Sequence, residues 1–101
     1  MLAKVKRRPT HPGQLLREET LPASGLTAAE LAAQLGVPHR NITALLNEHR
    51  AVTPDLAHRL SRVLKTTPEF WLRLQEAVDI WDMSQANRQE YDRLKPLNER
   101  A

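Results

Sequence analysis

The residues with the clearest binding chemistry lie together in one short segment, His39–Leu46. Apolar residues recur there with i, i+3, i+4 spacing, so a helix over this segment would bury one face. The residues of that inner face are Ile42, Leu45 and Leu46. The residues left on the outer face are His39, Arg40, Thr43 and Ala44. This outer face combines hydrogen-bonding groups with a methyl group, which are the groups that can contact base edges in a major groove.

Each outer residue has its own chemistry toward a base. Arg40 can bond bidentately to O6 and N7 of guanine, and Thr43 can offer a hydroxyl or a methyl group. His39 can donate or accept a hydrogen bond, and the methyl group of Ala44 can pack against thymine. The alternative for Arg40 is a solvated helix residue, or an intramolecular ion pair with a nearby acid.

Further polar residues within this segment, just after it and at the start of the preceding helix are suited to contacts with phosphates. They are Thr27, Asn41, Asn47 and Arg50. Asn47 has a second interpretation, because an asparagine at this point can instead cap the C-terminal end of the helix. Both interpretations of Asn47 stay open on the sequence alone.

The positive charge of the chain is concentrated at its N-terminus. The chain has 15 Lys and Arg against 12 Asp and Glu, a net charge of +3. The first eight residues hold four basic residues and no acid, and these are Lys4, Lys6, Arg7 and Arg8. Without them the remaining 11 basic and 12 acidic residues leave a net charge of −1. This basic arm can reach phosphates or a minor groove, or it can serve only to keep the chain soluble.

The other reactive residue types form no recognisable catalytic or metal site. The chain has no cysteine, which excludes disulfides, a thiolate nucleophile and cysteine-based zinc sites. None of its four histidines pairs with another at i, i+4. Glu76, Asp79 and Asp82 repeat at i+3, which a solvated helix face explains without an active site. We therefore expect no enzyme, no metal and no cofactor.

Length and composition favour one small domain. The chain has 101 residues, of which 41% are hydrophobic and 27% charged, values outside the range of disordered and membrane proteins. No apolar run approaches the roughly 18–20 residues that span a bilayer. Met1–Arg8 is not followed by the apolar stretch of a signal peptide. The expected location is the cytoplasm.

Start and stop signals predict an all-α fold of five helices with no strand. The expected helix starts lie near His11-Pro12, Thr27, Pro38, Thr53-Pro54 and Thr67-Pro68. The first helix is expected to end at Pro22 and Gly25. The second is the best specified, because Thr27 and Glu30 fit a capping box and Gly36 fits a left-handed C-terminal cap.

The sequence divides into a basic arm (1–9), a helical domain (10–83) and a C-terminal tail (84–101). After Met83 the residues become polar, and we expect the fifth helix to fray between Ser84 and Leu94. The large aromatic residues of the fifth helix are Phe70, Trp71 and Trp81, and all three are most simply core residues. Trp81 and Tyr91 have an alternative role at a protein interface.

Only Leu35-Gly36-Val37 separates the second helix from the third, and this turn is too short for antiparallel packing. Two short helices joined by a short turn with glycine are typical of a helix-turn-helix. Ala32 and Ala33 are small where the second helix passes close to the third. The alternative is a generic corner between two helices of a small bundle.

Leu31–Val37, followed by Ile42, Leu45, Leu46 and Asn47, resembles the XRE/Cro-type helix-turn-helix family. Two narrower motifs resemble the HigA-type antitoxins within it. One is His11–Glu19, and the other runs from Thr53–Leu60 to Thr67–Gln75, where the string Thr-Pro-Glu-Phe-Trp-x-x-Leu-Gln is specific. The resemblance covers about His11 to Trp81.

The resemblance implies a lambda-repressor-like (Cro/C1-type) fold with a basic N-terminal arm. It also implies a homodimer that binds double-stranded operator DNA, represses its own operon and neutralises a HigB-like toxin, a RelE-like ribonuclease. This sequence departs from the family pattern at Pro38, Ala44 and Glu48. Pro38 replaces the usual Ser or Thr cap, Ala44 replaces a polar reader, and Glu48 replaces the Gly that usually follows the Asn.

Two other functions remain possible from the sequence. One is a free-standing repressor that shares the same DNA-binding site and has no toxin partner. The other is a helical protein-interaction module that keeps the fold and has lost DNA binding. The surface that a toxin would contact stays open between the basic arm, the outer face of the first helix and the polar tail.

Overall fold

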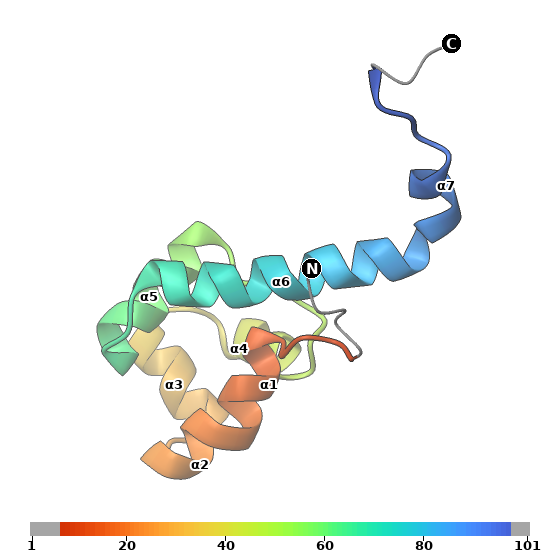
Figure 1. Cartoon of the computed structure of the whole chain (residues 1–101). Helices are drawn as coiled ribbons and strands as arrows, with labels where there is room; N and C mark the ends of the chain where they lie inside the picture. The colour runs from red at the N-terminus through yellow and green to blue at the C-terminus, as the bar shows by residue number, and fades with distance from the viewer. Residues whose placement is uncertain (1–6, 98–101) are drawn as a thin grey trace.

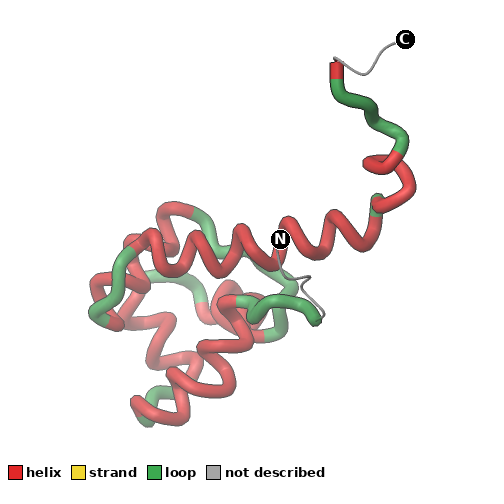
Figure 2. Tube along the Cα trace, in the orientation of Figure 1, coloured by secondary structure: helices red, strands yellow, loops and turns green. Residues whose placement is uncertain are grey.

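The structure is a computed structural model that describes residues 7–97, and every regular element in that range is helical (Figures 1 and 2). The elements are α1 (Pro12–Leu15), the π-helical turn η1 (Leu16–Thr20), α2 (Leu21–Ser24), α3 (Ala28–Leu35), α4 (His39–Leu46), α5 (Pro54–Leu64), α6 (Pro68–Ala86) and α7 (Arg88–Asp92). The predicted all-α class is confirmed. α1, η1 and α2 together form the predicted first helix, and the short α7 is an addition to the five predicted helices.

The predicted end of the first helix is right at Gly25 and wrong at Pro22. The helix continues through Pro22 because it contains a π-helical turn. The N–H of Leu21 donates to the carbonyl of Leu16, five residues earlier, so the turn before Pro22 is wider than in an α-helix. Proline lacks an N–H and its ring crowds the preceding turn of a regular helix. The π turn accommodates that ring, and the helix continues to Ser24. Gly25 then ends it with φ of 73°.

The predicted boundaries of the helix-turn-helix are confirmed. The Thr27 side chain accepts from the N–H of Glu30 at 3.1 Å, and the Glu30 carboxylate accepts from the N–H of Thr27 at 2.9 Å. Gly36 has φ of 73° and caps α3 in the left-handed region. α4 begins at His39, with Pro38 as its N-cap residue.

The core lies where α1, η1, α3, α4, α5 and the first half of α6 meet. Its fully buried large side chains include Leu16, Leu31, Ile42, Leu45, Leu60 and Trp71. Leu46 is only half-buried, so the predicted inner face of α4 is carried mainly by Ile42 and Leu45. These two side chains anchor α4 to the core from one side only.

α6 is the longest helix, and its first half packs against α5 while its second half extends away from the body (Figure 1). It ends at Ala86, and α7 follows after a break at Asn87, within the interval where fraying was predicted. Trp71 is buried as predicted. Phe70 is 41% exposed, so its assignment to the core is wrong. Trp71 takes the buried position, and Phe70 meets its ring edge-on at 5.0 Å.

The backbones of α1 and α4 touch at Gly13. A Cβ atom on Gly13 would lie 1.8 Å from the carbonyl oxygen of Leu45, closer than any real contact. Any larger residue must therefore separate the two helices, which disturbs the packing around Leu45.

We expect Gly13→Ala to lower the free energy of unfolding by about 3 kcal/mol, because α1 must move away from α4. Gly25→Ala is the matched control. Gly25 has a positive φ, unlike Gly13, and nothing lies near its Cβ position, so the cost there is about 1 kcal/mol and comes from the backbone conformation alone. Urea denaturation measures both values, and equal losses for the two variants would show that the α1–α4 contact is not tight.

His11 caps the first helix from a buried position. Its Nδ1 accepts from the N–H of Gly13 at 2.9 Å, and the residue is 3% exposed. Burial lowers the pKa of this imidazole; the nearby Glu48 carboxylate raises it, and Arg8 lowers it. The neutral ring is needed, because a protonated Nδ1 cannot accept the hydrogen bond.

Because the folded pKa of His11 lies below the unfolded value, the folded state binds fewer protons and loses stability as the pH falls. We expect the free energy of unfolding to decrease from about pH 7 to pH 5. His11→Asn supplies an oxygen acceptor that does not titrate, so its profile over this range should be flatter. His58→Asn, at an exposed position on α5, serves as the control and should keep the natural slope. A His11→Asn profile parallel to the natural one would contradict this assignment.

Candidate nucleic-acid interface

The outer face of α4 carries the residues that the sequence selected for contacts with bases. His39, Arg40 and Thr43 are exposed, whereas Ala44 is half-buried. Within residues 7–97, Arg40 forms no ion pair and no side-chain hydrogen bond, so its guanidinium is available to a ligand. The Thr43 hydroxyl donates to the carbonyl of His39 at 3.2 Å, which leaves its oxygen lone pairs free to accept. The first turn of α4 therefore presents two unoccupied side chains, His39 and Arg40.

The predicted phosphate-contacting residues differ in solvent exposure and in whether their side chains are already hydrogen-bonded. Arg50 and Asn47 are exposed and Asn41 is half-buried, while the Thr27 hydroxyl is used in the capping box of α3. Asn41 and Arg50 line one small hollow of about 60 Å³ together with Thr53, the N-cap residue of α5. These polar groups therefore face the same space beside the first turn of α4.

The C-terminal end of α4 is closed by Glu48 and not by the side chain of Asn47. Glu48 has φ of 63°, and its N–H donates to the carbonyl of Leu45 at 2.9 Å. The N–H of His49 donates to the carbonyl of Ala44, also at 2.9 Å. The Asn47 side chain makes no hydrogen bond within the described part of the chain, so it is not needed as a cap.

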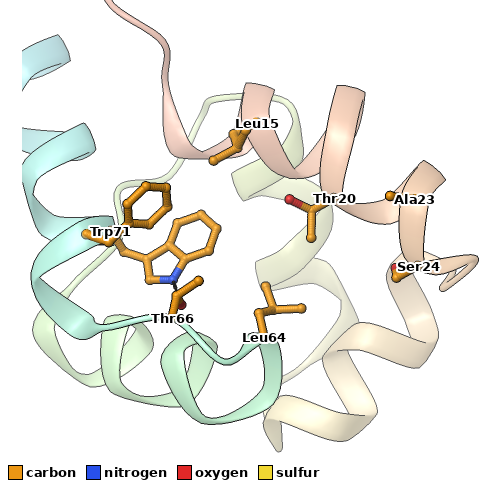
Figure 3. Close-up of a pocket in the computed structure, with 8 residues that line it drawn as sticks. Leu15, Thr20, Ala23, Ser24, Leu64, Thr66 and Trp71 are labelled. Atoms are coloured by element: carbon orange, nitrogen blue, oxygen red, sulfur yellow. Dashed lines mark hydrogen bonds between the residues drawn. The ribbon is translucent and has the colours of Figure 1, made fainter.

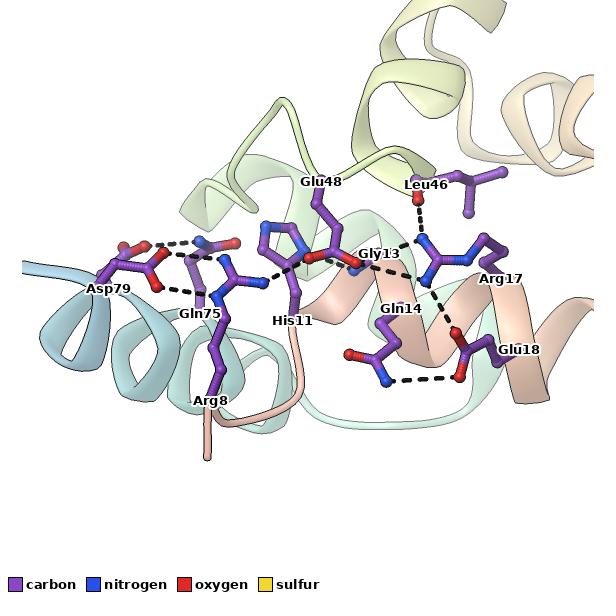
Figure 4. Close-up of polar contacts among 11 residues, drawn as sticks. Arg8, His11, Gly13, Gln14, Arg17, Glu18, Leu46, Glu48, Gln75 and Asp79 are labelled. Carbon is purple, nitrogen blue, oxygen red and sulfur yellow. Dashed lines mark hydrogen bonds and ion pairs between the residues drawn. The ribbon is translucent and has the colours of Figure 1, made fainter. Parts of the chain in front are cut away.

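Two basic residues of the arm, Arg7 and Arg8, lie in the part of the chain that the structure describes. Lys4 and Lys6 lie outside the described residues, and Arg7 is exposed. Arg8 is held by the body of the protein, where its Nε and Nη2 donate to the Asp82 carboxylate at 2.8 and 2.9 Å. Its Nη1 donates to Glu48 at 2.6 Å (Figure 4). The sequence placed Arg8 with the arm, but in this structure its hydrogen bonds go to two acids of the domain.

Arg17 holds the same end of α4 from the first helix. Its guanidinium donates to the carbonyl of Leu46, lies 3.4 Å from the Glu48 carboxylate and pairs with Glu18 at 2.9 Å (Figure 4). Hydrogen bonds from Arg8 lower the pKa of Glu48, and Arg8 does the same to the pKa of Asp82. Both carboxylates are therefore ionised at neutral pH, and the network keeps its charges there.

Two further side chains position the helix-turn-helix, and the sequence analysis missed both. Arg59 of α5 donates to the carbonyl of Leu35 at 2.8 Å, at the turn between α3 and α4, and also pairs with Asp55. Gln75 of α6 is buried and accepts from the N–H of Val52 at 2.8 Å, which fixes the loop after α4. Both had a sequence signal to which no role was assigned: Arg59 stands at i, i+4 spacing from Asp55, and Gln75 is the last residue of the specific Thr-Pro-Glu-Phe-Trp-x-x-Leu-Gln string.

One hollow on the surface is mainly apolar. An apolar groove of about 430 Å³ lies between the first helix and α6, lined by Leu15, Leu64 and Trp71 among others (Figure 3). Its lining contains no titratable side chain, and the indole N–H of Trp71 is already bonded to Thr66 at 2.7 Å. Residues 7–97 also contain no cluster of ligands that could hold a metal ion. None of the helices in this range is long and apolar enough to cross a membrane.

The comparisons with known proteins agree with this geometry. A helix-turn-helix family model, HTH_3, matches residues 16–71, which include α3, the turn and α4. Antitoxin HigA-1 of Vibrio cholerae is 41% identical over 96 residues, covering 95% of this chain and 90% of the relative. The uncharacterised regulator YbaQ of Escherichia coli K12 is 38% identical over 100 residues, covering 97% and 88%.

A solved structure extends the likeness to a DNA complex. Antitoxin GraA in complex with its operator superposes with a TM-score of 0.84 at 42% identity, covering 95% of this chain and 98% of that one. The family is one of DNA-binding antitoxins and regulators and not a known class of enzyme. The resemblance inferred from the sequence motifs is thus confirmed, and the chain belongs to the helix-turn-helix family and, within it, to the HigA-type antitoxins.

Proposed function

We propose that α4 enters the major groove of operator DNA and that the protein is an antitoxin that represses its own operon. This proposal rests on the free guanidinium of Arg40 in the first turn of a helix whose opposite face is buried at Ile42 and Leu45. The N-terminal residues of such a helix are those that reach base edges. His39 and Thr43 extend the same outer face, and Ala44 adds a methyl group at its margin.

Phosphate contacts would come from both ends of the helix-turn-helix. Asn41, Asn47 and Arg50 surround α4 with side chains free to donate, and Thr27 begins α3, where backbone N–H groups also point outward. From the arm, we assign Lys4, Lys6 and Arg7 to phosphates, whereas Arg8 is engaged by Glu48 and Asp82. The domain itself is almost neutral, so these contacts must come from a few well-placed residues.

A homodimer would supply the affinity that one nearly neutral module lacks. The projecting half of α6 exposes Ile80 and Met83. Beside them the buried indole N–H of Trp81 has no acceptor within residues 7–97. A second copy covering this face would bury the apolar side chains of Ile80 and Met83. Two copies would place two α4 helices on successive major grooves of a palindromic site, about 34–36 Å apart.

The proposed partner beyond DNA is a HigB-like toxin, a RelE-like ribonuclease encoded beside this chain. The relatives named as antitoxins support this role, and their similarity extends over nearly the whole chain. We infer that the protein is not an enzyme and acts in the cytoplasm. A repressor without a toxin is the second candidate, favoured by the similarity to the regulator YbaQ.

Sequence specificity tests the role of α4. Selection from random duplexes with the natural protein should enrich a palindrome, and Arg40→Ala should weaken binding to it by about tenfold while random DNA is bound as before. The control Arg62→Ala removes an exposed arginine from the far end of α5 and should change neither affinity. Replacing Lys4, Lys6 and Arg7 by Ala should instead weaken both duplexes equally and reduce their salt dependence. Equal losses on both duplexes for Arg40→Ala would contradict the assignment.

Co-expression tests the antitoxin role. If the adjacent gene encodes a toxin, the two products should co-purify, and expression of the neighbour alone should stop growth until this chain is supplied. Arg40→Ala should still rescue growth, because Arg40 is assigned to DNA and not to the toxin. A neighbour that neither binds this protein nor harms the cell would favour the free-standing repressor.

A further inference from the structure

We propose that Glu48 is a positioning residue for operator recognition, which holds the C-terminal end of α4 between the first helix and α6. This inference rests on the proposed function, since it concerns how α4 is presented to DNA. It concerns a residue that does not itself read a base. The two carboxylate oxygens of Glu48 contact two different arginines, Arg8 and Arg17.

One oxygen of Glu48 fixes α4 to the first helix. Oε2 lies 3.4 Å from both terminal nitrogens of Arg17 in η1. The same guanidinium donates to the carbonyl of Leu46, one of the last carbonyls of α4, which have no partner within the helix. Arg17 therefore holds the end of α4 by its backbone and by the side chain that follows it.

The other oxygen connects α4 to α6 through Arg8. Oε1 of Glu48 accepts from Nη1 of Arg8 at 2.6 Å, while the other side of that guanidinium binds the Asp82 carboxylate with two bonds. Such a bidentate pair fixes the plane of the guanidinium as well as its position. Asp82 lies on α6 between Trp81 and Met83, on the helix whose exposed face is proposed to meet the second copy. The bridge thus links the helix that reads DNA to the helix that would set the spacing between two such helices.

The backbone at Glu48 does not call for a glutamate. Its φ of 63° lies in the left-handed region, which glycine adopts at least cost. The side chain therefore occupies a position where it is conformationally unfavourable, and what it adds is the pair of arginine contacts. Glu48 also places a negative charge near the end of a DNA-reading helix, which by charge alone would weaken binding to phosphates.

Stability is a weak explanation for this bridge. The side chains of Arg8, Glu48, Arg17 and Asp82 are between 23% and 44% exposed, and ion pairs with that access to solvent contribute little to folding. Geometry is the stronger explanation, because a reading helix must be held within a fraction of an ångström by its supporting residues. In this proposal Arg8 connects Glu48 to Asp82 and does not contact DNA.

The central test is Glu48→Gly, which removes the carboxylate and suits the backbone conformation. We expect its melting temperature to equal or exceed that of the natural protein, while the ratio of affinities for the selected palindrome over random DNA falls about fivefold. Binding to random DNA should become tighter, because one negative charge is lost. Fluorescence anisotropy at matched salt measures both affinities. An unchanged ratio, with both duplexes bound more tightly by the same factor, would reduce Glu48 to a charge effect and overturn the proposal.

Two further variants separate positioning from charge. The carboxylate of Glu18 also binds Arg17, but Glu18 itself does not contact α4. For Glu18→Gln, the ratio of affinities for the palindrome over random DNA should therefore stay at the natural value. Asp82→Asn keeps Glu48 and weakens the other half of the bridge, so its ratio should fall in the same direction as that of Glu48→Gly. A Glu18→Gln ratio that fell as far as that of Glu48→Gly would contradict a specific role for Glu48.

The outcomes also distinguish this inference from the proposed function. If selection with the natural protein enriches no sequence, operator reading by α4 fails and the positioning role fails with it. If a palindrome is enriched and depends on Arg40 but not on Glu48, the proposed function stands and only the positioning role is overturned.

Discussion

The contact between the backbones of α1 and α4 determines how α4 is oriented on the domain. Gly13 leaves no room for a Cβ atom against the carbonyl of Leu45, and the side chains of Ile42 and Leu45 are fully buried on the same side. α4 cannot rotate without opening this contact. Its outer face, with Arg40 near the start, is therefore directed away from the core by packing alone. Specific readout of bases requires such a fixed orientation.

Polar contacts also fix the orientation of α4, and they lie at the two ends of this helix. Arg59 binds the carbonyl of Leu35 at the turn that precedes the helix, and Gln75 holds the loop that follows it. Arg17 and Glu48 fix the last turn. The bond from Val52 to Gln75 is buried and satisfies a backbone N–H that would otherwise lack an acceptor, so it also adds stability. The ion pair between Arg17 and Glu48 lies at the surface and restricts direction more than it adds stability. The domain thus combines a small apolar core with polar restraints around one exposed helix.

Most of the fold could be predicted from sequence signals that act over a few residues. Thr27, Glu30 and Gly36 give the limits of α3 because capping chemistry acts over three or four residues, and the same holds for the Thr-Pro starts of α5 and α6. The end of the first helix is mispredicted at Pro22. A proline signals the end of a regular α-helix, but the π turn at Leu16–Thr20 makes room for its ring, and the proline itself does not reveal that turn. Of the candidate DNA-contacting residues, the exposure of His39, Arg40 and Thr43 followed from helical spacing. The engagement of Arg8 by Glu48 and Asp82 did not, because those contacts join residues 40 and 74 positions apart.

If Arg40 reads a guanine from the major groove, its bond to N7 can be detected by substitution with a base analogue. Each guanine of the selected palindrome would be replaced in turn by 7-deazaguanine, which lacks the N7 acceptor. We expect one symmetric pair of positions where this change weakens binding by the natural protein but has no effect on Arg40→Ala, since the bond is already missing. Losses that add independently at every guanine in both proteins would contradict it.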